Sequence, residues 1–315
     1  MKKNSENFYI GADSGGTKCE ILIERVSGEK INHVFPSIHY SLHGAKSFSE
    51  DFNRNLKTFL NQQDIDINKC LGICIGIAGA RRRQDKVALK NSLSKYLGIK
   101  KIAIETDAMI AIYGAFGNND GAILIAGTGS VLYAIHDGKL HRIGGWGKIL
   151  GDQGSGYWIG KEALRHIVRE FDIQPEPDSR SLLCKKILSE TGLNPSNIIG
   201  HTFDWNFPIQ EIAMIVLKCA GEKDNTSLKI LDSASDDLVK HISDFFESTG
   251  RKKPLDLVFV GSLICNDNLY SRKVRKKIKK LFGRKINILK NYNSPAFGGL
   301  QLAKKYFNDM NYNEN

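Results

Sequence analysis

The sequence predicts an α/β protein of two domains or lobes, and three observations predict it. A strand, a glycine-rich turn and two further strands occur near residue 9 and again near residue 121, which indicates an internal structural repeat. Residues 70–78 form a continuous apolar run bounded by glycine, which is typical of a strand buried in a parallel sheet. A chain of 315 residues can also bury substantial hydrophobic cores.

The first part of the chain reads as a three-stranded meander followed by alternating helices and parallel strands. Runs of apolar and β-branched residues predict strands at residues 9–12, 20–26, 30–35, 70–78 and 101–105. Apolar residues at helical spacing predict helices at residues 48–60, 84–97 and 109–116. A histidine-rich loop, residues 36–44, separates the third strand from the first helix.

The second part repeats the opening pattern and then becomes mainly helical. Strands are predicted at residues 121–126, 131–136, 139–143, 255–260 and 286–289. Helices are predicted at residues 157–171, 179–191, 209–220, 227–249, 272–285 and 294–306. A glycine-rich segment, residues 144–156, joins the repeated strands to the first of these helices.

The composition predicts a cytoplasmic globular protein. Hydrophobic residues make up 41% and charged residues 25% of the chain, and no signal peptide or membrane-spanning run is visible. The cysteines lie mostly in apolar runs and form no C-x-x-C pair, which favours reduced core thiols over disulfides, zinc or an iron–sulfur cluster. They are Cys19, Cys70, Cys74, Cys184, Cys219 and Cys265.

The net charge of +11 raises the question of a nucleic-acid partner. Much of the excess lies in residues 272–285, where Val274, Ile278 and Leu281 recur at helical spacing. The basic residues are therefore expected on the solvated face of an amphipathic helix. We predict neither a nucleic-acid nor a membrane partner.

The first glycine turn, residues 13–18, joins two strands and contains Asp13, Thr17 and Lys18. It matches neither G-x-G-x-x-G nor G-x-x-x-x-G-K-[ST]. Glycine lets backbone N–H groups approach phosphate oxygens, but a plain turn uses the same residues. The turn alone leaves both interpretations open, and its repeat at residues 127–130 favours phosphate binding.

Asp107 ends a predicted strand and opens a predicted helix, the place where an α/β fold presents groups to a ligand. Aspartate there also suits a helix N-cap, which is the competing structural role.

Eight motifs along the chain resemble, in order, those of the N-acetylglucosamine kinase branch of the BadF/BadG/BcrA/BcrD family, in the actin–hexokinase superfamily. They lie at residues 13–18, 76–80, 106–108, 126–130, 144–147, 151–159, 260–262 and 294–299. The resemblance covers nearly the whole chain. It implies two ribonuclease-H-like (actin-like ATPase) lobes, residues 1–117 and 118–295, with the active site in the cleft between them. A C-terminal helix at about residues 296–310 is expected to pack back on the first lobe.

The resemblance implies ATP-dependent phosphorylation of an amino sugar, with N-acetylglucosamine at its 6-hydroxyl as the first expectation. It makes Asp107 the catalytic base and Asp13 the ligand of Mg²⁺. The implied nucleotide-binding residues are Asp13, Gly15, Gly16, Thr17, Lys18, Gly127, Thr128, Gly129, Ala220, Gly261 and Ser262. The implied sugar-binding residues are Asp107, Ser130, Gly145, Trp146, Gly147, Asp152 and His39.

Two departures from the family pattern leave the sugar open. Ile38 stands where relatives carry a sugar-contacting Asn, and His39 or Tyr40 can hydrogen-bond in its place. Gln153 stands where many relatives have Glu. Glucosamine and N-acetylmuramate are therefore alternatives.

Two other functions compete with the kinase. The first is an ATPase activator of a dehydratase, for which the cysteines offer no evident cluster pair. The second is a sugar-sensing regulator, which we disfavour because eight residues before Tyr9 leave no room for a DNA-binding segment. A homodimer is expected by resemblance.

Overall fold

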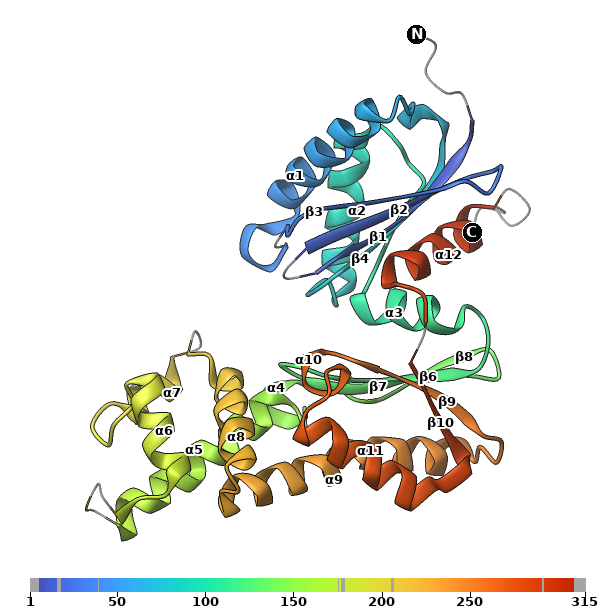
Figure 1. The fold of residues 1–315 in the computed structure, drawn as a ribbon. Helices are drawn as coiled ribbons and strands as arrows, with labels where there is room; N and C mark the ends of the chain where they lie inside the picture. The colour runs from blue at the N-terminus through green and yellow to red at the C-terminus, as the bar shows by residue number, and fades with distance from the viewer. Residues whose placement is uncertain are drawn as a thin grey trace. The chain divides into compact units, whose positions relative to one another are not determined.

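The computed structural model describes residues 6–15, 18–38, 40–174, 176, 179–204, 207–290 and 292–308. Contacts divide the chain into two compact units, one made of Met1–Asn119 with Asn291–Asn315 and the other of Asp120–Lys290. Each unit contains a five-stranded mixed sheet with helices packed on it (Figure 1). The predicted α/β class is confirmed. Among the described helices, none is long and apolar enough to cross a membrane.

The sheet of the first unit has the strand order β3-β2-β1-β4-β5. Its strands are β1 (Phe8–Ser14), β2 (Lys18–Arg25), β3 (Lys30–Pro36), β4 (Cys70–Ile77) and β5 (Ile102–Glu105). The first three strands form the predicted antiparallel meander, whereas β4 lies parallel to β1 and β5 lies parallel to β4. The carboxyl ends of β1, β4 and β5 therefore meet at one edge of the sheet.

Helices cover both faces of this sheet (Figure 1). They are α1 (Tyr40–Gln62), α2 (Arg83–Leu97), α3 (Asp107–Phe116) and α12 (Pro295–Phe307), with a short 3₁₀ helix at Ile67–Lys69. Because successive side chains of a strand point to opposite faces, Ile10 and Ala12 pack with α1 and α2. Tyr9 packs with α3 and α12 on the other face.

The C-terminal helix α12 lies directly on β1. A Cβ atom added to Gly11 would stand 2.1 Å from both the Ala296 carbonyl oxygen and the Leu300 nitrogen. Glycine is therefore required at this crossing, because any side chain would hold the backbones of β1 and α12 apart.

The sheet of the second unit has the strand order β10-β9-β6-β7-β8. Its strands are β6 (Gly121–Ala126), β7 (Ser130–His136), β8 (Lys139–Gly144), β9 (Leu255–Val260) and β10 (Ile286–Leu289). Strands β6, β7 and β8 repeat the antiparallel meander, and β9 lies parallel to β6. The internal repeat predicted from the sequence is thus a repeat of structure.

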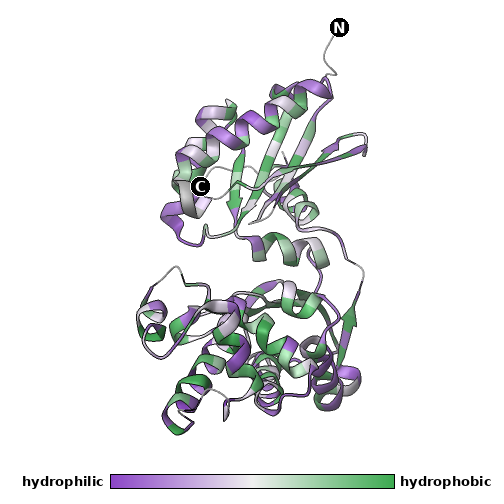
Figure 2. Ribbon diagram, turned by 60° about the vertical axis from the view of Figure 1, so that its left-hand side comes forward, coloured by the Kyte–Doolittle hydropathy of each residue, from purple (hydrophilic) through white to green (hydrophobic). Residues whose placement is uncertain are grey.

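The helices of the second unit share one hydrophobic core with the sheet. They are α4 (Gly147–Leu150), α5 (Gly156–Ile173), α6 (Leu182–Thr191), α7 (Ile198–Phe203), α8 (Ile212–Gly221), α9 (Asn225–Thr249), α10 (Ser262–Cys265) and α11 (Leu269–Phe282), with 3₁₀ helices at Ile209–Glu211 and Gly283–Lys285. Figure 2 shows the helices with mixed hydropathy, as expected when one side of each faces the core.

Two features differ from the sequence prediction. Helix α1 begins at Tyr40, inside the predicted loop, and is kinked at Gly44, where φ is 73°. The short helices α4, α7 and α10 were not predicted, because segments of four to six residues are too short to display a helical period.

Candidate active site

Two carboxylates lie at the carboxyl edge of the parallel strands in the first unit. Asp13 in β1 pairs with Gly76 in β4, which in turn pairs with Glu105 in β5. Asp107 follows two residues after Glu105 and opens α3, where Thr106 is the N-cap and its hydroxyl accepts the Met109 N–H at 3.2 Å. Because Thr106 caps the helix, Asp107 is not needed for that role.

The pKa of Asp13 is raised from 3.8 to about 6. Burial is the main cause, and the negative charges of Asp107 and Glu20 add to it. Lys18 opposes the rise only weakly, since its ammonium is paired with Glu20 at 2.8 Å. Asp13 is therefore a partly desolvated carboxylate with little compensating charge, an environment that a bound cation would relieve.

The first glycine turn is tied to the loop that follows β3. The Gly15 N–H donates to the Lys18 carbonyl at 3.0 Å, and the Ser37 hydroxyl donates to the Gly15 carbonyl at 2.8 Å. The Gly15 N–H predicted to meet phosphate is thus already engaged in closing the hairpin. Gly16 and Thr17, predicted to bind phosphate, lie outside the described residues, as does His39.

The burial of Ile38 accounts for the departure from the family pattern at this position. Its side chain is 6% exposed and belongs to the core shared by α1 and α2. Its carbonyl accepts the Ser14 hydroxyl at 3.4 Å, so the position is anchored by packing and by its backbone. A polar side chain that contacts substrate cannot be supplied from here.

The second glycine turn, residues 127–129, joins β6 to β7 and is braced by the start of α5. The Gly156 and Tyr157 N–H groups donate to the Gly127 and Thr128 carbonyls at 2.8 and 3.2 Å. The Gly127 N–H donates to the Gly129 carbonyl at 3.0 Å. Two of the first N–H groups of α5 are therefore used to fix the shape of the turn.

Asp152 lies against this turn. A Cβ atom on Gly129 would be 2.8 Å from the Asp152 Oδ2 atom, so the carboxylate packs directly over the glycine. Asp152 itself has a φ of 57°, a left-handed conformation that aspartate tolerates better than most residues. Ser130, predicted to lie near the sugar, is 2% exposed and donates to the Gln153 carbonyl at 2.6 Å, so it fixes the Asp152 loop.

The segment predicted to bind sugar turns sharply after β8 and contains the short helix α4. Gly145 and Gly147 have φ values of 72° and 84°, and the Gly151 N–H caps α4 by donating to the Gly147 carbonyl at 2.8 Å. Trp146, the N-cap residue of α4, is 67% exposed, with the Arg142 guanidinium 4.4 Å from the centroid of its ring. This arrangement holds an aromatic face available to a ligand.

The three residues predicted to bind adenosine lie in two different environments. Gly261 follows β9 with a φ of 95°, and a Cβ there would be 2.4 Å from the Ala126 carbonyl oxygen. Gly261 and the exposed Ser262 thus lie beside the second glycine turn. Ala220, in α8, is 3% exposed and belongs to the core of the unit.

Sequence reasoning missed a network behind Asp107. Glu105 accepts from Lys86 at 2.6 Å and from the Tyr306 hydroxyl at 3.0 Å. These bonds join α2, β5 and α12 two residues before Asp107. The lone Glu at the end of β5 gave no periodic or motif signal, so only the fold reveals this contact.

One further cluster looks like a metal site and is not one. Asp120, His136 and Asp137 bring their ligand atoms close together. The Arg251 Nη1 atom lies 2.6 Å from Asp120 Oδ2 and 2.9 Å from His136 Nδ1. A guanidinium that is always charged already fills the place of a cation.

Comparisons with known proteins agree with this architecture. Two similar relatives are the N-acetylmuramic acid/N-acetylglucosamine kinase of Clostridium acetobutylicum, 31% identical over 94% of this chain and 98% of the relative, and the N-acetyl-D-glucosamine kinase of Dictyostelium discoideum, 28% identical over 95% and 98%. A crystal structure of a candidate N-acetylglucosamine kinase from Chromobacterium violaceum superposes with a TM-score of 0.73 at 22% identity, covering 95% of this chain and all of that one. The model of one family matches residues 10–303. The chain belongs to the BadF/BadG/BcrA/BcrD ATPase family.

Proposed function

We propose that the protein is an ATP-dependent kinase of amino sugars, with N-acetylglucosamine phosphorylated at its 6-hydroxyl. The observation that carries the proposal is the pair of carboxylates Asp13 and Asp107 at one edge of the first sheet, in a chain whose full-length relatives are named as amino sugar kinases. Its membership of an ATPase family supports ATP as the phosphoryl donor. Glucosamine and N-acetylmuramate remain alternative acceptors.

Asp107 is the proposed catalytic base. It orients the sugar hydroxyl and accepts its proton as the oxygen bonds to the γ-phosphorus of ATP, while the bond to the β-phosphate oxygen breaks and ADP leaves. Thr106 caps the helix, and Asp107 Oδ1 accepts the Ala108 N–H at 2.9 Å, which orients the carboxylate and leaves its other oxygen for this task.

Asp13 is the proposed ligand of Mg²⁺. A hard cation prefers carboxylate oxygen, and the raised pKa of Asp13 reflects burial and the nearby negative charges of Asp107 and Glu20, both of which a bound cation would offset. When bound, Mg²⁺ would neutralise charge on the nucleotide phosphates. Lys18, held by Glu20, and the turn residues Gly15, Gly16 and Thr17 complete the first proposed phosphate-binding segment.

The second unit supplies the remaining proposed contacts. Gly127, Thr128 and Gly129 form a braced turn for phosphate, and Gly261 and Ser262 form the neighbouring turn for adenosine. Ala220, in the neighbouring helix α8, is also proposed for the adenosine site, where its burial limits it to a packing contact. The proposed sugar-binding residues of this unit are Ser130, Gly145, Trp146, Gly147 and Asp152.

A coupled assay of ADP release tests the proposal. The panel contains N-acetylglucosamine, glucosamine and N-acetylmuramate, with glucose as the control for selectivity. We expect Mg²⁺-dependent turnover that is highest for an amino sugar. Turnover of glucose alone, or ATP hydrolysis unchanged by any sugar, would refute it.

The same assay distinguishes the kinase from a dehydratase activator, because the activator is expected to hydrolyse ATP whether or not sugar is present. None of the six cysteines forms a disulfide, and Cys265 alone among them is exposed, which disfavours a cluster held by exposed cysteine pairs. We also propose a cytoplasmic location, which the ATP requirement supports. A homodimer is proposed from the family resemblance, and sedimentation tests it.

A further inference from the structure

The loop that carries Asp152 has an unusual backbone conformation. Asp152 has a φ of 57° and Gly154 has a φ of 76°, so the chain passes through two left-handed residues in quick succession. At a residue other than glycine, such a conformation persists only where the surrounding structure enforces it. The groups that hold this loop therefore help to place the Asp152 carboxylate over Gly129.

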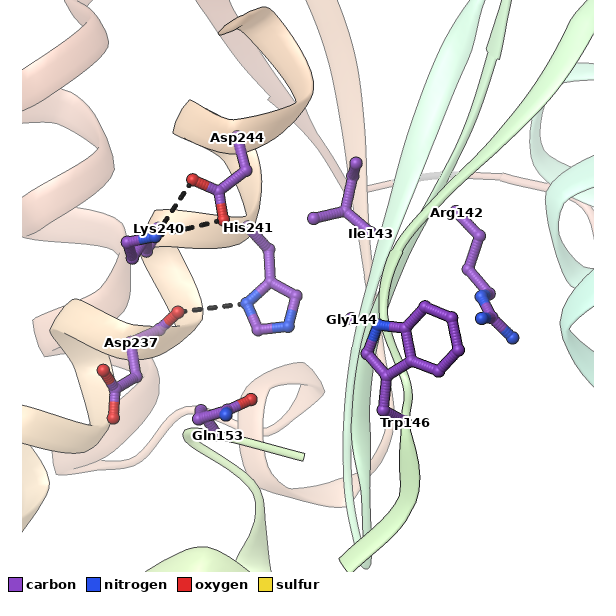
Figure 3. A pocket seen from close by; sticks show the side chains of 9 residues that line it. All are labelled: Arg142, Ile143, Gly144, Trp146, Gln153, Asp237, Lys240, His241 and Asp244. Carbon is purple, nitrogen blue, oxygen red and sulfur yellow. Dashed lines mark hydrogen bonds and ion pairs between the residues drawn. The ribbon is translucent and has the colours of Figure 1, made fainter. Parts of the chain in front are cut away.

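The first two carbonyl groups of the loop are held by serines. The Ser155 N–H donates to the Asp152 carbonyl at 3.1 Å, and the Ser130 hydroxyl of β7 donates to the Gln153 carbonyl at 2.6 Å. The exposed side chain of Gln153 lines the pocket between β8 and α9, where it makes no hydrogen bond to any residue that the structure describes (Figure 3). The loop is thus joined to the sheet through its backbone.

The third carbonyl, that of Gly154, is held by a side chain from a distant helix. The Tyr270 hydroxyl donates to it at 2.6 Å and also lies 3.1 Å from the Ala234 carbonyl oxygen in α9. A Cβ atom on Gly154 would be 2.6 Å from that same oxygen, so the loop lies directly on α9. Tyr270 therefore joins the end of the loop, α9 and its own helix α11 at one point.

Tyr270 is a fixed hydrogen-bond donor. Its side chain is 0% exposed within the core of the second unit, and it follows the N-cap residue Asn268, which forms a capping box with Ser271. Burial, with a smaller contribution from the charge of Asp237, raises the pKa of the Tyr270 hydroxyl, so the hydroxyl stays protonated. Phenylalanine would fill the same space, so packing alone does not require the hydroxyl.

Helix α9 also contacts the start of the glycine-rich segment, residues 144–156. A Cβ atom on Gly144 would be 2.2 Å from the His241 Nε2 atom, and Figure 3 shows the imidazole beside that glycine. His241 is 5% exposed, and its Nδ1 atom lies 3.0 Å from the Asp237 carbonyl oxygen in the same helix. The segment is therefore held against α9 near both ends, by His241 at the first and by Tyr270 at the second.

We propose that Tyr270 is a positioning residue for the acceptor sugar, because its hydroxyl holds the Asp152 loop in the conformation that binds sugar hydroxyls. This inference rests on the proposed kinase function, in which Asp152 contacts the sugar. Without the hydroxyl, the buried Gly154 carbonyl loses its donor, which favours a shift of the loop towards water or another donor. A small misplacement of a group that orients the substrate weakens both binding and turnover.

Steady-state kinetics and calorimetric titration of Tyr270→Phe test the proposal, with N-acetylglucosamine and ATP as substrates. The ring is kept, so the core stays filled. We expect the KM and the Kd for the sugar to rise about tenfold or more, while the KM for ATP stays unchanged. Calorimetry reads the Kd from folded molecules, because unfolded protein lowers only the measured stoichiometry.

Ser235→Ala is the matched control, because it removes another buried hydroxyl bond beside Ala234 in α9. Ser235 is 0% exposed, and its hydroxyl donates to the Asp232 carbonyl at 2.6 Å. This variant should lose stability in urea unfolding without a change in the KM for either substrate. A purely structural role of Tyr270 would give the same result as this control.

A double-mutant cycle tests whether Tyr270 acts through Asp152. In an Asp152→Asn background, Tyr270→Phe should change the Kd for the sugar much less than it does in the wild-type chain, because the carboxylate that it positions has been removed.

The proposal is overturned if Tyr270→Phe leaves the KM for the sugar unchanged, if it raises the KM for ATP equally, or if its effect is undiminished by Asp152→Asn. Failure of the kinase proposal would look different, because the wild-type protein would then neither bind nor phosphorylate N-acetylglucosamine, and the role of Tyr270 would fall with it.

Discussion

Asp13 and Asp107 are chemically identical side chains that the fold places in different environments. Asp13 lies within β1, where burial raises its pKa, whereas Asp107 begins a helix that Thr106 already caps. The first environment suits a cation, and the second leaves an oxygen available for a proton. Their separate roles can be tested one residue at a time.

We expect Asp107→Asn to lower kcat by about 10²- to 10⁴-fold, because the amide cannot accept the hydroxyl proton. KM should change much less, since the amide still hydrogen-bonds. Steady-state kinetics with circular dichroism on the same samples measures both. Asp172→Asn, an exposed change on α5, is the matched control. Near-wild-type turnover by a folded Asp107→Asn variant contradicts the assignment.

Asp13 should make stability depend on pH. Its folded pKa of about 6 lies above the unfolded value of 3.8, so the folded state binds the proton more tightly and stability falls as pH rises from about 4 to 6. Asp13→Asn removes this loss of stability, because the amide does not ionise. Without Mg²⁺, the variant should gain on the order of 2 kcal/mol relative to wild type above pH 6. Urea unfolding at pH 4 and pH 7 measures the difference, which should be absent for Asp172→Asn.

Protons and Mg²⁺ should compete at Asp13. Only the ionised carboxylate binds the cation, so the Mg²⁺ concentration that gives half-maximal rate should rise as pH falls below about 6. Asp13→Ala should raise that concentration at every pH. Titrations of rate against Mg²⁺ at fixed ATP report both effects. A Mg²⁺ requirement unaltered by the substitution would exclude Asp13 as a ligand.

At the scale of elements, the strands and the longer helices were predictable because each carries a strong local pattern. The apolar run of β4 and the two repeated meanders could be predicted without any tertiary information. The start of α1 at Tyr40 was not predictable, since packing rather than periodicity sets it. The burial of Ile38 and the contact of His241 with Gly144 join residues far apart in sequence, so no local signal could identify them.

The crossing of α12 over β1 gives a prediction about packing. Gly11→Ala places a Cβ atom only 2.1 Å from backbone atoms of Ala296 and Leu300. Helix α12 must therefore move away from the sheet. We expect a loss of about 3 kcal/mol or more in the free energy of unfolding. Gly200→Ala, in α7 with nothing within 4 Å, should be neutral or stabilising. Denaturant unfolding of both variants measures the contrast.

At the scale of the whole molecule, the second unit is one continuous segment and the first is not. Residues 120–290 include a complete sheet and core, so this fragment should fold alone with a cooperative transition. Residues 1–119 lack α12 and would expose the surface that Leu300 and Phe307 cover. We expect that fragment to aggregate unless a peptide of residues 291–315 is added. Circular dichroism and light scattering measure both outcomes, and a stable monomer of residues 1–119 would contradict the prediction.

The position of α12 also orders events during synthesis. The first strands leave the ribosome early, but the helix that covers one face of their sheet follows the whole second unit in the sequence. The second unit has its full sequence before then. The unit that is begun first is therefore completed only after the second unit has been made, and until α12 emerges its open apolar face is exposed to aggregation.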